Sequence, residues 1–428
     1  MFSVIARLCD RFRRWARTGG FAVSMPKRLS DRKIVPDGGS FGIPIPERLS
    51  GRRLTVRQRV KLVASGASAF LGLTRMPVGP LRLQIEPVPY CNLLCPACPR
   101  SFDTFERRDG FLEPKMFDRL LRTFRPMLVN LTGYGETMMH PSLLSLLRIG
   151  RRLGAHTRFT TNATMIDRES INDLAEAGLD SITVSLDSVD AETYEKIRKG
   201  DTLAKLLAKL DLLFDQSSPL RDRTHINTVL FGSDTRQLAD VLDVCATRFS
   251  IEPSIALEIG DRARSYGEAG EGSRTLKRLR PTIDAALRVA EERGLPYSQR
   301  RLKYFVEMLG AKPGVHSDAP CMMPWTNMTV YADGEVTPCA FWRPEAPEGV
   351  LGNINEQSLS DIWNGDAYRK LRSDHLSSRS TVRTCMECGY ADWDVDRIFR
   401  RAVEIAPPLG RITKRRFDAP QPRFAITE

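Results

Sequence analysis

Residues 81–100 read LRLQIEPVPYCNLLCPACPR and join a short alternating segment to three closely spaced cysteines. Leucine and isoleucine alternate with polar residues over residues 81–86, which predicts a β-strand. The cysteines follow as C-x3-C-x2-C at Cys91, Cys95 and Cys98. Three thiolates on one short loop can each bind one iron of a [4Fe–4S] cluster, which leaves the fourth iron open to a small molecule.

Zinc is the alternative ligand for this loop. A zinc site would need a fourth protein ligand, but the chain has only five histidines and none lies near the loop in sequence. The spacing also differs from the two separated C-x2-C pairs that are common in zinc modules. The pattern therefore favours an iron–sulfur cluster.

Beyond the loop, strand and helix patterns alternate along the chain. We expect further strands at residues 128–132, 156–161, 182–186, 226–231 and 254–258, and helices at 114–124, 141–153, 168–177, 203–214, 235–249 and 274–293. Six βα units predict an α/β fold with a parallel sheet that can curl into a partial (β/α)6 TIM-like barrel. Functional residues of such barrels lie at the carboxyl ends of the strands.

Polar motifs follow three successive predicted strands. They are Gly133-Tyr-Gly-Glu-Thr137, Thr160-Thr-Asn162 and Ser185-Leu-Asp-Ser188. Each motif alone is compatible with an ordinary strand-end turn or helix cap. Together with the cysteine loop, in this order, they resemble the radical S-adenosylmethionine (SAM) superfamily. In that family the open iron binds SAM, and reductive cleavage of SAM yields a 5′-deoxyadenosyl radical that abstracts a substrate hydrogen.

The resemblance implies which residues serve the cofactor. Cys91, Cys95 and Cys98 would ligate the cluster. Contacts to SAM would come from the residues at the strand ends, namely Gly135, Glu136, Asn162, Ser185 and Arg198. A carboxylate at Glu136 can accept hydrogen bonds from the SAM ammonium, and Arg198 can pair with the SAM carboxylate. The chain departs from the family pattern where Ala97 replaces an aromatic residue and Tyr134 separates the two glycines of the motif.

A second group of cysteines follows the barrel pattern. Its members are Cys321, Cys339, Cys385 and Cys388. Two short strands joined at Asp333-Gly334 predict a hairpin, and a helix is expected over residues 358–373. Four thiolates can fully ligate a second [4Fe–4S] cluster, with a four-cysteine zinc site as the alternative. The region resembles the SPASM and twitch auxiliary domains of radical SAM enzymes, and no cysteine after residue 388 favours one cluster.

Charge is distributed unevenly along the chain. The net charge is +12, but the excess of Lys and Arg lies near the two ends rather than in the barrel region, unlike a typical nucleic-acid enzyme. Residues 1–17 have the pattern of a basic amphipathic helix, which can lie on an anionic membrane or dock on its own protein. No apolar run is long enough to cross a membrane, so we expect a cytoplasmic protein, with peripheral membrane contact through this helix as a possible addition.

These patterns divide the chain into four parts. We expect a basic leader, linker and helix at residues 1–80, the radical SAM barrel at 81–300, the small α+β auxiliary domain at 301–395 and a basic tail at 396–428.

The expected function is hydrogen abstraction from an organic substrate. The twitch-like spacing favours net oxidation of a small molecule or carbohydrate by an oxidoreductase whose auxiliary [4Fe–4S] cluster accepts an electron. A SPASM-type maturase acting on peptide or protein side chains is one alternative. A non-catalytic iron–sulfur or zinc scaffold is another. The resemblance also implies an electron donor such as flavodoxin or ferredoxin.

Overall fold

The computed structural model describes the central part of the chain. The described residues are 48–49, 52–53, 55–101, 110–230, 238–257, 272–310, 321–342, 344, 346, 348–378 and 381–386. All of them belong to one compact unit, Pro36–Glu428. The predicted leader helix at residues 1–17, the basic tail and Cys388 lie outside the described residues.

Nine strands form one mixed sheet in the order β11-β10-β9-β3-β4-β5-β6-β7-β8. Their bounds are β3 Arg82–Ile85, β4 Leu128–Leu131, β5 His156–Thr161, β6 Ser181–Ser185, β7 Thr224–Leu230, β8 Ser254–Leu257, β9 Asn327–Val330, β10 Glu335–Thr337 and β11 Gly352–Asn353. Neighbours from β3 to β8 pair in parallel, as do β3 and β9. Only β10 runs antiparallel to its neighbours β9 and β11. The sheet is not closed, which confirms the expected partial barrel.

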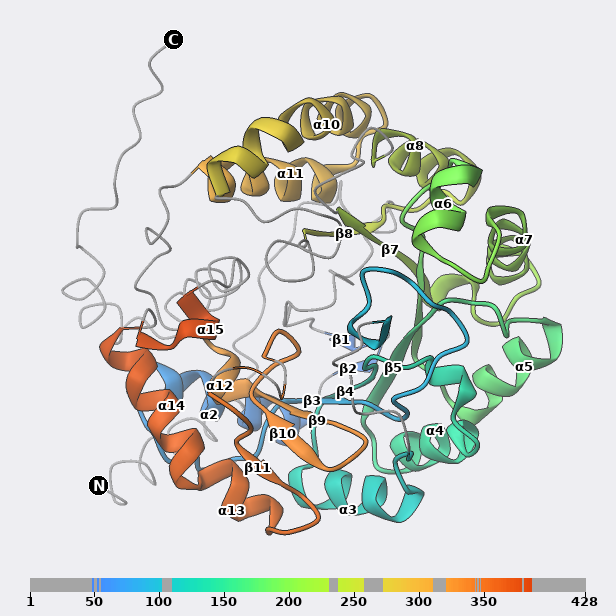
Figure 1. Ribbon diagram of the computed structural model, residues 1–428. Coiled ribbons are helices and arrows are strands. Elements are labelled where there is room, and N and C mark those ends of the chain that lie inside the picture. Colours follow the sequence, from blue (N-terminus) through green and yellow to red (C-terminus); the bar gives the residue numbers. More distant parts are fainter. Residues whose placement is uncertain are drawn as a thin grey trace. The chain divides into compact units, whose positions relative to one another are not determined.

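Helices follow the parallel strands and cover the outer face of the sheet (Figure 1). Their bounds are α3 Pro114–Phe124, α4 Leu143–Arg152, α5 Arg168–Ala177, α6 Ala191–Ile197, α7 Leu203–Phe214, α8 Leu238–Arg248, α10 Gly272–Glu292 and α11 Pro296–Gly310. The short helix α6 and the long helix α11 were not predicted from the sequence. In both helices polar residues interrupt the apolar periodicity by which a helix is recognised in sequence.

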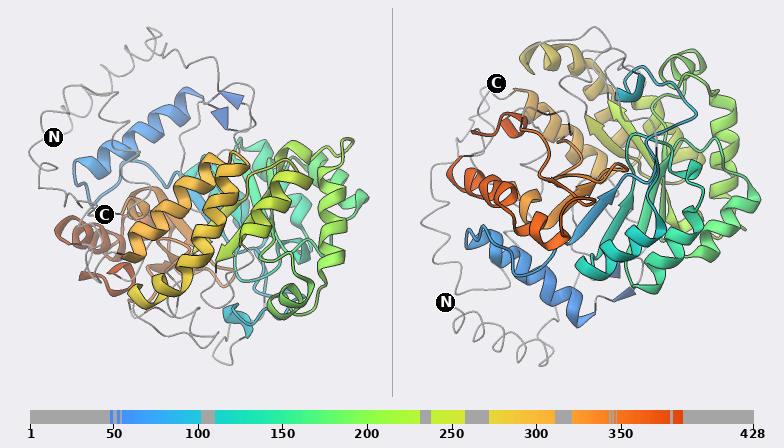
Figure 2. Two further views of the ribbon diagram at one scale, coloured as in Figure 1. Left: turned by 90° about the horizontal axis from the view of Figure 1, so that it is seen from above. Right: turned by 60° about the horizontal axis from the view of Figure 1, so that its bottom comes forward.

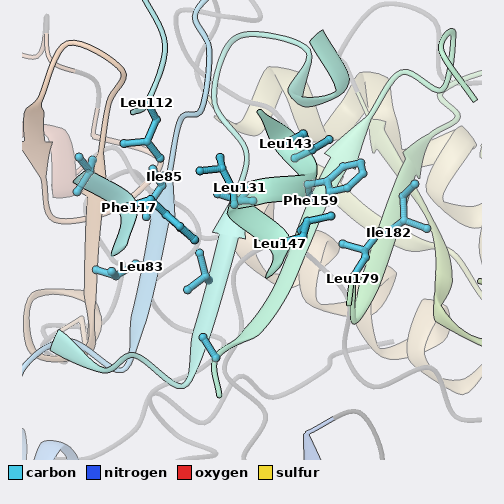
Figure 3. Close-up of a cluster of buried hydrophobic side chains, with 14 of the residues drawn as sticks. Leu83, Ile85, Leu112, Phe117, Leu131, Leu143, Leu147, Phe159, Leu179 and Ile182 are labelled. Carbon is cyan, nitrogen blue, oxygen red and sulfur yellow. The ribbon is translucent and has the colours of Figure 1, made fainter. Parts of the chain in front are cut away.

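Burial alternates along β5 and β7, and successive residues of every strand face opposite sides of the sheet. Leu83, Leu131 and Phe159 are fully buried and pack against residues such as Phe117 of α3 and Leu147 of α4 (Figure 3). The residues between them, one position along each strand, therefore face the inner side of the curved sheet. Apolar side chains build the outer core, and the inner face carries the polar positions.

The C-terminal part extends the barrel sheet through the predicted hairpin, β9 and β10. Four helices accompany it: α12 Met323–Thr326, α13 Leu359–Asn364, α14 Asp366–Ser377 and α15 Arg383–Met386. The single helix expected over residues 358–373 is wrong, because the chain breaks at Gly365 into α13 and α14. At that glycine a Cβ atom would lie 2.4 Å from the carbonyl oxygen of Asp361.

Helix α2 (Val56–Phe70) begins with a capping box between Thr55 and Gln58 and lies outside the sheet (Figure 2). The segment after it is tied to the C-terminal part, since Leu73 and Val78 accept hydrogen bonds from the indole groups of Trp325 and Trp363. Two-residue strands β1 (Arg48–Leu49) and β2 (Arg52–Arg53) precede α2. None of the described helices is long and apolar enough to span a bilayer.

Candidate iron–sulfur and SAM site

The first cysteine loop lies directly after β3, at the carboxyl end of the barrel. Cys91, Cys95 and Cys98 are half-buried, and Ala97 between them is buried. Tight backbone turns shape the loop: the N–H of Cys98 donates to the carbonyl of Cys95 at 2.9 Å, and the N–H of Ser101 donates to the carbonyl of Cys98 at 2.8 Å. The local sequence thus holds three thiols on one short, internally hydrogen-bonded segment.

The turn after β4 packs tightly against this loop. The Glu136 N–H donates to the Tyr90 carbonyl at 2.9 Å. A Cβ atom at Gly135 would lie 2.1 Å from the Val88 carbonyl oxygen and 2.5 Å from that of Tyr90. Only glycine therefore permits this close approach, which explains one glycine of the motif by packing. The motif positions the cysteine loop against the end of β4.

Glu136 is a buried carboxylate held by the neighbouring strand end. One oxygen accepts from the Thr161 hydroxyl at 2.7 Å and from the Met138 N–H at 3.0 Å, and the other accepts from the Asn162 N–H at 2.8 Å. Burial raises the pKa of Glu136, and these donors only partly oppose the shift. In the structure, Glu136 positions the end of β5.

Asn162 connects the end of β5 to the cysteine loop. Its side-chain amide lies 3.6 Å from the Cys91 sulfur and donates to Asn92 at 2.9 Å, while its oxygen accepts from Thr164 at 2.7 Å. The Leu93 N–H also donates to the Cys91 sulfur, at 3.4 Å. Burial is the main cause that raises the pKa of the Cys91 thiol. Two N–H donors therefore face a sulfur that would carry negative charge as a ligand.

Ser185 and Arg198 lie on the next βα unit. Ser185 ends β6, on the strand beside β5. Arg198 forms a salt bridge with Asp187, and another of its guanidinium nitrogens lies 4.0 Å from the Cys95 sulfur. Burial opposes the charged form of Arg198, but Asp187 and Cys95 outweigh it and raise the pKa. A cation is thus held beside the loop.

This donor set fits a [4Fe–4S] cluster. Thiolate ligands carry negative charge, and hydrogen bonds and cations around the sulfurs stabilise it. The described residues contain no group of three or more Cys, His, Asp or Glu side chains placed to hold a single metal ion. A cubane would take the three thiolates on three separate irons.

The second cysteine group is partly described. Cys339 and Cys385 pack against the same small core of Trp342, Leu371 and Val382. His375 on α14 places its Nε2 atom 3.3 Å from the Cys385 sulfur. Cys321 precedes α12, and Arg372 of α14 donates to the carbonyl of Pro324 in α12 at 2.9 Å.

Four contacts near the site were not predicted from the sequence. Glu86, fully buried after β3, accepts from the N–H of Tyr134 at 2.7 Å and from that of Ala332 at 3.3 Å. Tyr134 stacks on Tyr331 with ring centroids 6.0 Å apart. Asp187 holds Arg198. The position of Glu86 and Asp187 at or just after the ends of predicted strands could have marked them as functional candidates. Their binding partners, however, are known only from the folded structure.

Comparison with known proteins assigns both parts of the chain. Residues 85–245 match the model of the radical SAM superfamily, and residues 321–389 match the SPASM model, an iron–sulfur cluster-binding domain. The Radical SAM domain uses a [4Fe–4S] cluster with SAM, and the SPASM domain holds an auxiliary iron–sulfur cluster.

Relatives and solved structures agree with this assignment. PqqA peptide cyclase of Gluconobacter oxydans is 24% identical over 298 residues, covering 68% of this chain and 78% of the relative. A probable GTP 3′,8-cyclase of Thermococcus kodakarensis is 27% identical over 298 residues, covering 67% of this chain and 92% of the relative. SuiB of Streptococcus suis, crystallised with its precursor peptide SuiA, shares the fold with a TM-score of 0.54 at 20% identity, covering 78% of this chain and 76% of SuiB.

These relatives are enzymes, so the comparisons support catalysis and give no support to a non-catalytic scaffold. The cysteine loop and the strand-end motifs lie inside the first matched region. The C-terminal cysteines lie inside the second, of which Cys321 is the first residue. The chain belongs to the radical SAM superfamily and is an enzyme with a C-terminal SPASM domain.

Proposed function

We propose that this protein modifies a peptide or protein side chain by radical chemistry. The observation that carries the proposal is the similarity to PqqA peptide cyclases over about two thirds of the chain. A second such cyclase, from Streptomyces rochei, is 26% identical over 320 residues and covers 72% of this chain. This evidence favours the peptide alternative over the oxidation of a small molecule or carbohydrate that the cysteine spacing alone suggested.

The chemistry of the bound cofactor is reductive cleavage of SAM, which supplies a radical that removes a hydrogen atom from the substrate. In our proposal Cys91, Cys95 and Cys98 hold the first cluster. Asn162 and Arg198 orient SAM from the ends of β5 and α6. Ser185 adds a hydroxyl donor at the end of β6, and Gly135 and Glu136 hold the turn that supports the cysteine loop.

The C-terminal residues hold the auxiliary cluster in this proposal. Cys321, Cys339, Cys385 and Cys388 complete a four-thiolate set, which leaves no iron open to substrate. A fully ligated cluster suits electron transfer from an oxidised substrate radical, and a donor such as flavodoxin or ferredoxin would reduce the first cluster.

Deuterium transfer into 5′-deoxyadenosine tests the substrate class. Reconstituted, reduced enzyme with SAM is incubated with an extract of fully deuterated cells, separated into a peptide and protein fraction and a small-molecule fraction. We expect deuterated 5′-deoxyadenosine from the first fraction, and its loss after protease digestion. The Cys91→Ala variant serves as the control that cannot form the radical. Deuterium transfer from the small-molecule fraction alone would instead support a small-molecule substrate, the class to which the GTP named for one relative belongs.

We also propose peripheral contact with an anionic membrane. Helix α2 turns valines outward: Val56, Val60 and Val63 are 71%, 45% and 37% exposed. Its inner face carries Lys61, whose Nζ donates to the Pro80 carbonyl at 2.7 Å, just before β3. The exposed valines therefore lie near the amino ends of the strands, opposite the cysteine loop. Apolar and arginine side chains together are typical of helices at anionic lipid surfaces.

Vesicle sedimentation tests this contact. We expect the protein to sediment with vesicles containing phosphatidylglycerol and to be released by the double variant Val60→Glu/Val63→Glu or by deletion of residues 1–25. Vesicles of phosphatidylcholine alone are the control for charge. Equal binding of wild type and both variants would contradict the proposal.

A further inference from the structure

The inner face of the barrel is mainly polar in its described part. Residues on alternate positions of the strands face this side, opposite the apolar outer core. The polar residues among them include Arg82, Gln84, Asn130, His156, Arg158, Thr183, His225, Asn227, Ser254 and Thr329, whereas Leu128, Val229 and Ala256 are apolar. A barrel filled only for stability would carry packed aliphatic side chains at such positions. The polar lining indicates a place for a polar ligand.

Arg158 is a charged residue in the middle of this lining. It lies on β5, in register with Asn130 of β4 and Ser181 of β6. Its Nη2 atom is buried without a hydrogen-bond partner, and no carboxylate among the described residues forms an ion pair with it. Burial lowers the pKa of Arg158 to about 10, so the guanidinium remains charged at neutral pH.

His225 lies beside Arg158 on the same face. It is in register with Thr183, which is in turn in register with Thr160, two residues after Arg158. Its Nδ1 atom is also buried without a hydrogen-bond partner. Burial, with Arg158 and His156 nearby, lowers the pKa of His225 to about 4, so the imidazole is neutral and can still donate one hydrogen bond.

Arg372, a fully buried arginine, finds most of its partners within the fold, although its Nη2 atom, like that of Arg158, has no hydrogen-bond partner. Arg372 of α14 donates to the carbonyls of Pro324 and Thr74, and its guanidinium lies 4.4 Å from the ring centroid of Trp363 and 4.9 Å from that of Tyr368. Arg158 lacks comparable partners. A buried charge is normally paired, because removal from water is costly. A counter-charge from a ligand would complete the arrangement.

We propose that Arg158 and His225 bind a carboxylate group of the substrate on the inner face of the barrel, below the residues at the strand ends. Arginine binds carboxylates in a bidentate manner, and the neutral imidazole adds a donor. One positive charge matches a monoanionic carboxylate better than a phosphate dianion. The inference rests on the proposed function only for the source of that group, an acidic side chain or C-terminus of a peptide.

Binding of small probes tests the site without turnover, so its failure is distinct from failure of the peptide proposal. Reconstituted enzyme with SAM is titrated with N-acetylglutamate α-amide, its neutral analogue N-acetylglutamine α-amide, sodium butyrate and inorganic phosphate, at constant ionic strength. We expect the glutamate probe to bind at least tenfold more tightly than the glutamine probe. Butyrate binding as tightly as the glutamate probe would identify a free carboxylate as the source and keep the site.

Substitutions complete the test. Arg158→Gln should abolish the preference for the carboxylate probe, and His225→Gln should weaken binding severalfold. Arg280→Gln removes an exposed arginine paired with Asp284 and should change nothing. Because Arg158→Met removes a partly buried charge without an ion-pair partner, its unfolding temperature should equal or exceed that of the wild type. Unchanged carboxylate preference in Arg158→Gln, tighter binding of phosphate, or strong destabilisation by Arg158→Met would overturn the proposal.

Discussion

His375 is a buried side chain whose contact with Cys385 has a measurable consequence. With the sulfur as a cluster ligand, Nε2 donates an N–H···S hydrogen bond, which stabilises the reduced cluster. We predict that His375→Phe makes the reduction potential of the auxiliary cluster more negative, measured by a redox titration followed by electron paramagnetic resonance. The potential of the first cluster should not change.

The exposed residue Ser373 on the same helix provides the matched control, as Ser373→Ala. A purely structural histidine would alter iron content or unfolding temperature without moving the potential of clusters that still form. An unchanged potential in a fully loaded His375→Phe enzyme would contradict the prediction.

His225 makes stability depend on pH. Its folded pKa is about 4, below the ordinary value of 6.5. Between these values the unfolded chain takes up a proton that the folded protein does not, so stability falls as pH falls from 6.5 to 4, by at most about 3 kcal/mol. The unfolding temperature should therefore drop between pH 7 and pH 5, and less steeply in His225→Gln, where Arg158 and His156 remain. Parallel pH profiles for the two proteins would refute this.

At the scale of elements, the carboxylate of Glu86 joins three segments. It ends β3, binds the turn after β4 through Tyr134, and binds the β9–β10 turn through Ala332. Because this carboxylate is fully buried, its loss leaves backbone N–H groups without an acceptor. We predict that Glu86→Ala lowers stability by roughly 2–4 kcal/mol, measured by chemical unfolding.

Glu86→Gln is the matched variant for this prediction, because it keeps the side-chain volume and one carbonyl oxygen. We expect it to lose about half as much stability as Glu86→Ala. Protection of residues 327–337 in hydrogen exchange should fall in Glu86→Ala as well. Normal protection there would show that the carboxylate does not tie the hairpin to the barrel.

Elements with a regular apolar pattern were predicted well from the sequence. The strands at 156–161 and 128–132 and the helices at 114–124 and 168–177 agree with β5, β4, α3 and α5 to within a residue. Helix α11 was missed because arginines interrupt its apolar face. The break at Gly365 was missed because the apolar pattern continues across this glycine, which ends α13 and caps the start of α14.

At the scale of the whole molecule, two cluster sites predict a definite iron content. Anaerobic reconstitution should give about eight irons per chain, four for each cluster. The triple variant Cys91→Ala/Cys95→Ala/Cys98→Ala should keep about four irons and lose all SAM cleavage. The variant Cys321→Ala/Cys339→Ala should also keep about four irons per chain. Unlike the triple variant, it should still cleave SAM in assays that contain no substrate. About four irons plus one zinc in the wild type would contradict an auxiliary [4Fe–4S] cluster.

The sequence alone determined the family, the cofactor loop and the candidate SAM contacts. The cysteine spacing and the strand-end motifs are local, and a parallel sheet brings the carboxyl ends of its strands together whatever their exact packing. Gly135, Glu136 and Asn162 could therefore be assigned to one site before the fold was known. The proposed substrate class rests on comparison with relatives, since the spacing alone favoured small-molecule oxidation.

Only the tertiary structure decided which residues lack or share partners. The pairing of β9 with β3 joins positions more than 240 residues apart in sequence, and Glu86 finds Ala332 through that pairing. The isolation of Arg158 on the inner face likewise depends on what every neighbouring strand does or does not supply. Long-range burial and pairing have no local signature, because each depends on side chains brought together only when the sheet curls.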